Sequence, residues 1–452
     1  MRGVTPLWTS EDIADATGGT ASTSFTATGV TFDSREAGPG HLFVAMKGET
    51  MDGHVFVPGA FAAGAAGALV SDPVEGPHVV VADTNAALNA LATAARARTS
   101  AKIVGVTGSV GKTGTKEALY AALDRHAPGR AHRSVKSYNN HTGVPLSLAR
   151  MPAGSAFGVF EMGMNHVGEL AELTQLVRPH AAIVTAIAPA HREFFADDEA
   201  IADAKGEIFS GLQPGGTAII PYDSPHRDRL IRAAQPHAAR ILTFGRHEGA
   251  DVYAREAMPT KGGTLVCAVL PDAELTFTLA PPGDHWVSNA MAVLAAVYAV
   301  GGDLPAAGLA LAELPGLPGR GERVTIRVPG GEALLIDESY NANPASMAAT
   351  LASLGREPGR RVAILGEMRE LGAESASFHA NLAPILRGNG VETLFLVGPG
   401  MLPLASQLPF SQHFPSVEAA IPNIALAPHD TLLVKGSNGV GLSRLVAALK
   451  AA

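Results

Sequence analysis

The chain has 452 residues, 46% of them hydrophobic and 17% charged, which predicts two to four folded domains and excludes an intrinsically disordered protein. No basic block offsets the formal net charge of −8, so we expect no nucleic acid among its partners. Cys267 is the only cysteine, which excludes an intramolecular disulfide and a zinc site built from cysteines.

The sequence shows neither an export signal nor a membrane span. The N-terminal segment MRGVTPLWTSED lacks the apolar core of a signal peptide. The longest apolar run, residues 290–300, is much shorter than the roughly 20 residues that a membrane span requires. We therefore expect a cytoplasmic protein that is not embedded in a membrane.

The first section, residues 1–98, has the pattern of a small α/β domain. An alanine-rich segment over residues 85–99 predicts a helix that leads out of it. The other expected elements are a helix at residues 57–64 and strands at residues 29–35, 41–48, 67–72 and 78–83.

The second section, residues 99–314, has the pattern of a larger α/β domain. Residues 102–107 are apolar and β-branched, a glycine-rich turn follows, and a helical pattern starts at Lys112. Alternating strands and helices predict a mainly parallel, mononucleotide-binding sheet. Its further strands are expected at residues 158–163, 181–187, 216–222 and 239–245.

The third section, residues 315–452, predicts a Rossmann-like α/β domain without a phosphate loop of its own. A helix is expected at residues 344–354, and strands at residues 333–340, 360–368, 393–400 and 431–437. The predicted fold class is therefore α/β in three domains, with the mononucleotide-binding sheet in the centre.

A glycine-rich segment opens the second domain and resembles a Walker-type phosphate loop. Its glycines let backbone N–H groups turn around phosphate oxygens, and the following helix presents its positive end. Lys112 can reach the terminal phosphates, and the Thr113 hydroxyl can ligate Mg²⁺. Counted from Gly105 the spacing is one residue longer than usual, so a plain glycine-rich turn with an exposed Lys112 is the alternative. The expected phosphate-binding residues are Gly108, Ser109, Val110, Gly111, Lys112 and Thr113.

Three further residues are candidates for metal chemistry. Glu161 ends a buried strand beside the phosphate loop, where a Mg²⁺ ligand belongs; the alternative is a solvated carboxylate in a turn. His191 follows another strand, although a lone histidine is more often structural than a ligand. Lys205 lies in a helical segment, where an ordinary surface lysine paired with Asp203 or Glu207 is the alternative.

Ordered segments over nearly the whole chain resemble the Mur ligase family, which comprises three-domain ATP-dependent ligases that build the peptide of bacterial cell-wall precursors. The phosphate loop TGSVGKT resembles the family's T-G-[ST]-x-G-K-T. The resemblance continues through SYNNHTGVPLSL, EMGMNHVGEL, AIAPAHREFF, ADAKGEIF, PPGDHWVSNAMA, LPGRGERV, DESYNANPASM and LGEMRELG. It implies ATP and Mg²⁺ as cofactors.

The resemblance also implies roles for matching positions. Lys112 and Thr113 would hold the ATP phosphates and Mg²⁺, Glu161 would ligate the metal, and His191 would serve a second metal site. Lys205 matches a lysine that CO₂ carbamylates, which yields an anionic group for the second metal. Lys112, Lys205 and His191 would thus be catalytic, and His285, Asn289, Arg320 and Asp337 would complete the nucleotide site.

Nine positions would contact the other substrates. Ser34, Arg35 and Lys47 match the UDP end, and Asn139, Asn140 and Thr142 lie in a loop expected near the UDP-sugar. The third-domain candidates are Asn341, Asn343 and His379.

Within the family, DESYNANPASM and LGEMRELG resemble the members that add D-alanyl-D-alanine, and the D-N-P-R motif of the tripeptide-forming members is absent. The implied partners are UDP-N-acetylmuramoyl tripeptide and D-alanyl-D-alanine, and we expect a monomer. Alternatives are a tripeptide-forming Mur ligase, a folylpolyglutamate-synthetase-like ligase, or a regulatory P-loop ATP-binding protein. Lys435 of the K-G-S segment is kept, but Asn438 stands where the family often has arginine, and Ser443 where glutamate is frequent.

Overall fold

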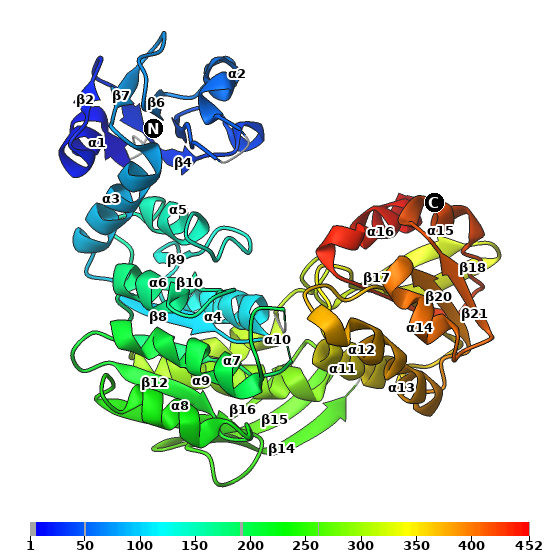
Figure 1. Ribbon diagram of the computed structural model, residues 1–452. Helices are drawn as coiled ribbons and strands as arrows, with labels where there is room; N and C mark the ends of the chain where they lie inside the picture. Colours follow the sequence, from blue (N-terminus) through cyan, green and yellow to red (C-terminus); the bar gives the residue numbers. More distant parts are fainter. Residues whose placement is uncertain (1–5, 49–50, 190–192, 261, 452) are drawn as a thin grey trace.

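The computed structural model describes residues 6–48, 51–189, 193–260 and 262–451, which form three α/β units in chain order (Figure 1). A small first unit, a central unit with a largely parallel sheet and a third α/β unit confirm the predicted fold class. The expected domain boundaries after residues 98 and 314 stay predictions; each lies between two of these sheets. Within the described ranges, no helix is long and apolar enough to cross a membrane.

The first unit is a five-stranded sheet in the order β2-β7-β6-β5-β4, whose last four strands are parallel. Helix α3 (Thr84–Ala97) leads from this unit to the central one (Figure 1). Asp83 caps its start, because its carboxylate accepts the backbone N–H groups of Asn85 and Ala86 in the first helical turn. The remaining elements are β1 (Trp8–Thr9), α1 (Ser10–Thr17), β2 (Thr20–Ala21), β3 (Thr26–Ala27), β4 (Gly29–Thr31), β5 (His41–Val44), α2 (Val57–Ala62), β6 (Gly67–Val70) and β7 (His78–Val80).

The first unit and the central unit share a continuous core. Leu88 and Leu91 of α3 are buried together with Leu146 of α5 (Gly143–Ala149) in the central unit. The indole N–H of Trp8 donates to the backbone oxygen of Ala149 over 2.8 Å. Apolar burial of this kind fixes the orientation of α3 on the central unit.

The central unit contains a nine-stranded sheet in the order β16-β15-β14-β13-β12-β11-β8-β10-β9. Its strands are β8 (Lys102–Thr107), β9 (Ala131–Arg133), β10 (Phe157–Glu161), β11 (Ala181–Val184), β12 (Thr217–Pro221), β13 (Arg240–Gly245), β14 (Val252–Thr260), β15 (Gly263–Leu270) and β16 (Ala273–Leu279). The strands from β9 to β14 along the sheet are parallel, as expected, whereas β15 and β16 add an antiparallel edge that was not predicted. Burial alternates residue by residue along β15, as in a strand with one face on the core.

Helices cover both faces of the central sheet. Helices α4 (Lys112–His126), α9 (Asp284–Ala299) and α10 (Leu304–Ala312) bury their apolar residues on one face. Helices α5, α6 (Glu169–Val177), α7 (Asp198–Gly206) and α8 (Arg227–Ala234) cover the other. Strand β8 lies between β10 and β11. The chain first adds strands on the β10 side of β8 and then on the β11 side, so the strand order reverses at β8. Ligands bind at such a switch point in open α/β sheets.

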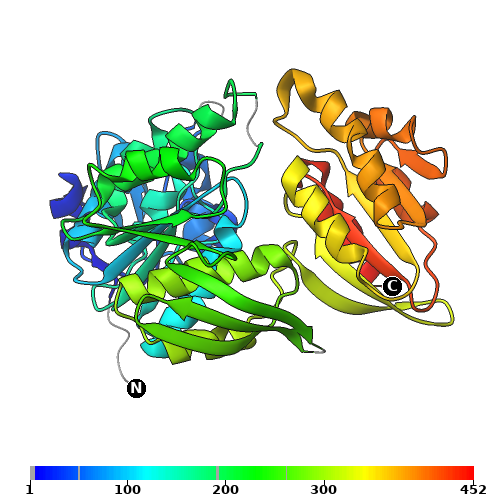
Figure 2. The same ribbon diagram turned by 90° about the horizontal axis from the view of Figure 1, so that it is seen from below.

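The third unit is a six-stranded sheet in the order β17-β18-β22-β19-β20-β21, parallel except for β17. Figure 2 shows it beside the central unit. Its strands are β17 (Glu322–Val328), β18 (Gly331–Glu338), β19 (Arg361–Gly366), β20 (Thr393–Val397), β21 (Ser411–Phe414) and β22 (Thr431–Lys435). Its main helices are α11 (Pro344–Leu354), α12 (Ser375–Ala380), α13 (Leu382–Gly388) and α16 (Leu442–Ala451).

Candidate active site

A cleft of about 760 Å³ lies between the central and third units. The central unit contributes the phosphate loop, the carboxyl ends of β10 and β11, and the first two turns of α9. The third unit contributes the segments that follow β18, β19 and β22. The carboxyl ends of parallel strands from two sheets therefore face one cavity, which is where α/β units bind ligands.

The phosphate loop has a backbone that only glycine adopts easily at two positions. Gly108 and Gly111 have φ angles of 147° and 85°. A Cβ on Gly108 would lie 2.0 Å from Oγ1 of Thr185, so the loop packs tightly on the end of β11. The Thr185 hydroxyl lies 2.5 Å from the Val110 carbonyl oxygen, to which it donates. These contacts hold the loop in one shape before α4 begins.

Lys112 begins α4 and lines the cleft, as the phosphate-loop prediction requires. Its Nζ donates to the Gly108 carbonyl oxygen over 2.6 Å. Desolvation lowers the pKa of this ammonium, and the Glu161 carboxylate opposes that shift. The cleft is also lined by Ser109, Val110, Gly111 and Thr113 from the predicted loop, but not by Gly108.

Glu161 and Thr113 form the centre of the candidate metal site. Oε2 of Glu161 accepts a 2.8 Å hydrogen bond from the Thr113 hydroxyl, and Oε1 accepts one of 2.8 Å from Nδ2 of Asn139. Both Glu161 and Thr113 are buried yet line the cleft. Carboxylate and hydroxyl oxygens are the ligands that Mg²⁺ prefers, and Mg²⁺ commonly takes only one or two of them from a protein beside substrate phosphates. These donors therefore fit a magnesium ion.

Lys116 was not predicted, although it lies one turn after Lys112. Its ammonium is fully buried and lies 2.9 Å from Oε1 of Glu117 and 3.9 Å from Oε2 of Glu161. It also donates to the carbonyl oxygens of Ser134 and Lys136. The sequence could have indicated its burial. Lys116 lies three residues after Thr113, so helical periodicity places both on the buried face of α4.

Lys205 is buried in α7 and lines the cleft, so it is not an ordinary surface lysine. Burial, with a further contribution from the positive charge of Lys112, lowers its pKa well below the usual range. Asp203, the expected alternative partner, instead pairs with Arg229 over 2.7 Å. Glu207 accepts the backbone N–H groups of Gly168, just before α6, and of Ala171 in its first turn.

His191, predicted as a metal ligand, lies outside the described residues. Among the residues that are described, no three histidine, cysteine, aspartate or glutamate side chains converge as a metal-binding cluster. A metal at Glu161 would therefore take its other ligands from Thr113 and from substrate oxygens.

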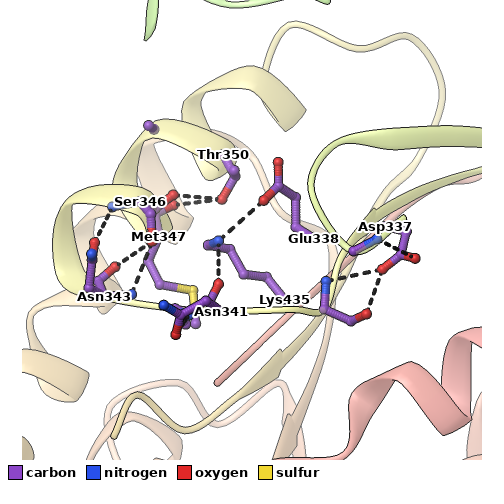
Figure 3. Close-up of polar contacts among 12 residues, drawn as sticks. Asp337, Glu338, Asn341, Asn343, Ser346, Met347, Thr350 and Lys435 are labelled. Carbon is purple, nitrogen blue, oxygen red and sulfur yellow. Dashed lines mark hydrogen bonds and ion pairs between the residues drawn. The ribbon is translucent and has the colours of Figure 1, made fainter. Parts of the chain in front are cut away.

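The opposite wall brings Arg320 to the cleft but turns Asp337 away from it. The Arg320 guanidinium lies 4.0 Å from the ring centroid of Tyr340 and donates to the Ser137 hydroxyl of the central unit over 3.2 Å. The carboxylate of Asp337 is buried and accepts the Gly319 N–H at 3.0 Å and the Ser339 hydroxyl at 2.6 Å (Figure 3). Asp337 therefore fixes the backbone just before Arg320 and the turn that follows β18.

Lys435 and Glu338 were not among the predicted site residues but line the cleft. They are register partners at the ends of the parallel strands β22 and β18. Figure 3 shows the Lys435 amino group between Glu338 and Asn341; Nζ lies 3.4 Å from Oε2 of Glu338 and 2.9 Å from the Asn341 carbonyl oxygen. Burial lowers the pKa of Lys435. Polar residues at the carboxyl ends of buried strands are the signal that identifies them.

Most other predicted nucleotide and third-domain residues also line this cleft, namely His285, Asn289, Asn341 and Asn343. Asn343 caps α11 by accepting the Ser346 N–H at 2.8 Å (Figure 3). His379 is fully buried instead. Its Nε2 accepts the Met368 N–H at 2.8 Å, and Nδ1 donates to the Ser375 carbonyl oxygen at 2.7 Å. It thereby fixes the segment after β19, which does line the cleft.

The residues predicted near the UDP-sugar lie apart from the cleft, except for Asn139. Asn140 accepts from the Thr142 hydroxyl at 3.0 Å and orders the start of α5. In the first unit, Ser34 lies in a short 3₁₀ turn, Arg35 pairs with Asp33 at 2.6 Å, and Lys47 lies 3.8 Å from Asp72. Their roles in substrate binding stay predictions.

Known proteins resemble this chain along its whole length. Three family models match it: "Mur ligase family, catalytic domain" over residues 26–103, "Mur ligase middle domain" over 106–297 and "Mur ligase, glutamate ligase domain" over 319–438. UDP-N-acetylmuramoyl-tripeptide–D-alanyl-D-alanine ligase of Escherichia coli K12 is 36% identical over 428 residues, 93% of each chain. Crystal structures of MurF from Acinetobacter baumannii include one at 31% identity and a TM-score of 0.86, covering 99% of this chain and 100% of that one. The MurF ligase of Thermotoga maritima in complex with ADP is 27% identical, with a TM-score of 0.77 and coverages of 94% and 97%.

Proposed function

Because the chain belongs to the Mur ligase family, we propose that it is an ATP-dependent ligase that joins D-alanyl-D-alanine to UDP-N-acetylmuramoyl tripeptide. The observation that carries the proposal is the cleft itself. The wall from the central unit has a phosphate loop, a hydrogen bond from Thr113 to Glu161, and a buried Lys205. The opposite wall comes from the third unit, which can hold an acceptor. We also propose that the chain acts as a monomer.

The reaction joins a carboxylate to an amine, and a carboxylate is a poor electrophile. Its oxygen first attacks the γ-phosphorus of ATP, so that ADP leaves and an acyl phosphate forms. The dipeptide amine then attacks the acyl carbon, and the tetrahedral intermediate expels phosphate as the amine loses its proton. Lys112 would stabilise the transferring phosphoryl group, a contribution typically worth a few kcal/mol.

Mg²⁺ would be held by Thr113 and Glu161 and would neutralise charge on the phosphate oxygens. Lys205 supports a second anionic ligand. Because burial lowers its pKa, more of the side chain is the neutral amine that can attack CO₂. The nitrogen gains a carboxyl group and loses a proton, and the carbamate that results is negatively charged. We propose that carbamylated Lys205 and His191 serve this second metal position.

The first unit would bind the UDP end through Ser34, Arg35 and Lys47, and Asn139 would lie near the sugar. The packing between the first and central units supports this arrangement. Helix α5 follows Asn139 in the chain and shares one hydrophobic core with α3 of the first unit. His285, Asn289 and Arg320 would contact the nucleotide.

The testing experiment is phosphate release from Mg-ATP and UDP-N-acetylmuramoyl tripeptide, with D-alanyl-D-alanine or without an acceptor. Release that requires the dipeptide, with a pentapeptide product by mass spectrometry, supports the proposal. Release that responds instead to diaminopimelate or lysine would identify a tripeptide-forming ligase, and glutamate a folylpolyglutamate-like one. ATP hydrolysis that ignores every acceptor would indicate a regulatory ATP-binding protein.

A further inference from the structure

Two loops of the third unit meet at one corner of the cleft. One follows β19 and carries Arg369, and the other follows β22 and carries Ser437 and Asn438. The backbone N–H of Arg369 donates to the Ser437 hydroxyl oxygen at 3.0 Å. The backbone N–H of Ser437 donates to the Glu367 carbonyl oxygen at 3.1 Å. These reciprocal bonds hold the backbone under the Arg369 side chain in a fixed position.

The guanidinium of Arg369 lies against the backbone of Gly439. A Cβ on Gly439 would come within 2.2 Å of Nη1 and 2.7 Å of Cζ, so the absence of a side chain there makes room for the guanidinium. On its other side, Nε lies 3.6 Å from Oε1 of Glu367. The side chain is nevertheless 54% exposed, and it lines the cleft. It is thus positioned by its neighbours but open to a ligand.

The other cationic side chains on this wall already contact other protein groups. Among the described residues of the third unit that line the cleft, the cationic side chains are those of Arg320, Arg369 and Lys435. Arg320 stacks on Tyr340 and reaches into the central unit, and Lys435 is buried against Glu338. Arg369 is the one whose planar, multidentate donor group is exposed at the cleft surface.

This corner faces the phosphate loop. Glu370 follows Arg369 with a left-handed φ of 62°, and its carbonyl oxygen accepts the Glu193 N–H of the central unit at 3.3 Å. Glu370 lines the same cleft as Lys112 of the phosphate loop. An acceptor held here would have one end beside Arg369 and the other directed toward the phosphate site.

We propose that Arg369 binds the C-terminal carboxylate of the acceptor dipeptide, with the side-chain amide of Asn438 as a second donor. The inference rests on the proposed function. An acceptor with a free C-terminus brings a carboxylate into a partly desolvated cleft, and an unpaired charge there is costly. A guanidinium pairs with a carboxylate through two parallel N–H donors. The assignment also gives a role to a segment where Asn438 replaces the arginine often found in the family.

The first test compares Arg369→Ala with the wild type in the phosphate-release assay. Loss of a charge-assisted contact predicts a rise in KM for D-alanyl-D-alanine of about ten- to a hundredfold. KM for ATP and for the UDP-tripeptide should stay within about twofold, which also shows that the variant folds. The wild type should discriminate against the C-terminal amide of the dipeptide, and Arg369→Ala should lose that discrimination. Arg369→Lys should recover part of it.

Gly439→Ala provides a matched variant that keeps the arginine but moves it. The new methyl group would displace the guanidinium, so KM for the dipeptide should rise in the wild-type background and change little in the Arg369→Ala background. An unchanged dipeptide KM in Arg369→Ala, or equal effects of Gly439→Ala in both backgrounds, would overturn the inference alone. A wild-type enzyme that does not use the dipeptide would overturn the proposed function and this inference together.

Discussion

The Thr113 hydroxyl donates a 2.8 Å hydrogen bond to Oε2 of Glu161, which joins the start of α4 to the end of β10. Both oxygens face the cleft beside Lys112, so a magnesium ion would replace one contact between them with two metal bonds. Glu161→Gln keeps the shape of the side chain but removes its charge. We expect phosphate release to fall by at least about a hundredfold and the Mg²⁺ concentration for half-maximal rate to rise.

Thr113 supplies the matching pair of variants. Thr113→Ser keeps the hydroxyl and should retain most activity, whereas Thr113→Val keeps the volume and should lose activity as Glu161→Gln does. Titrations of activity against Mg²⁺ at saturating ATP would measure both effects. Equal rates for the serine and valine variants would show that the hydroxyl is not a metal ligand.

If Lys205 is carbamylated, the activity of the enzyme should depend on dissolved CO₂. Burial favours its neutral amine, the form that reacts, and acidification protonates that amine. The wild type should therefore lose activity when bicarbonate is depleted and regain it when bicarbonate is added. Lys205→Ala should be at least about a hundredfold slower and insensitive to bicarbonate.

A short carboxylate such as acetate or propionate should restore part of the activity of Lys205→Ala by occupying the space of the carbamate. Exposed Lys102 provides the control, because Lys102→Ala should respond to bicarbonate as the wild type does. A wild-type rate that is the same in bicarbonate-free and bicarbonate-containing buffer would contradict carbamylation.

The residues that the sequence located best are those set by local structure. The phosphate loop lies within one strand–loop–helix segment, and Glu161 follows directly from the end of a buried strand. The role of Asp337 depends on contacts that no local pattern contains, since its carboxylate turns back to Gly319 and Ser339. His379 is similar, because the packing of α12 in the third unit decides which face of that helix is buried.

Arg369 and Gly439 illustrate the same limit. They are 70 positions apart in the sequence and meet only because β19 and β22 are neighbours in the sheet. The register of Glu338 with Lys435 likewise depends on strand order, which periodicity does not specify. Strand order in the third unit is 17-18-22-19-20-21, so the last strand inserts beside the second.

Lys116 should position the loop that carries Asn139. Its buried ammonium holds the carbonyl oxygens of Ser134 and Lys136, and Lys136 has a left-handed φ of 48°. Lys116→Met fills the same space but leaves those acceptors and the nearby carboxylates without their cation. We expect the free energy of unfolding to fall by about 2–3 kcal/mol and kcat by about tenfold.

Urea unfolding and steady-state kinetics would measure both quantities, with Lys102→Met as the exposed control. A purely structural role would lower stability without changing kcat or the KM for the UDP-tripeptide. The positioning role therefore requires a kinetic defect that persists at temperatures well below the unfolding transition of the variant.

His132 should make the fold sensitive to mild acid. It is partly buried beside Phe160, and Nε2 donates to the Ser147 carbonyl oxygen over 2.7 Å, so protonation would charge Nδ1 within the protein. Burial lowers its pKa from 6.5 to about 4. Between these values the unfolded chain binds more protons than the folded one, so stability is full above pH 6.5 and is lost as pH falls toward 4. From pH 7.5 to 5.0 this residue alone should lower the free energy of unfolding by up to about 2 kcal/mol.

His132→Gln separates this titration from those of other groups. The glutamine amide can still donate to Ser147 but does not titrate, so the variant should lose less stability than the wild type between pH 7.5 and 5.0. The difference between the two proteins is the relevant quantity, because the pKa of His180 is also lowered to about 4 and contributes in both. Urea unfolding at the two pH values would measure it. Identical losses in the two proteins would mean that His132 accepts a proton in the folded state at its ordinary pKa.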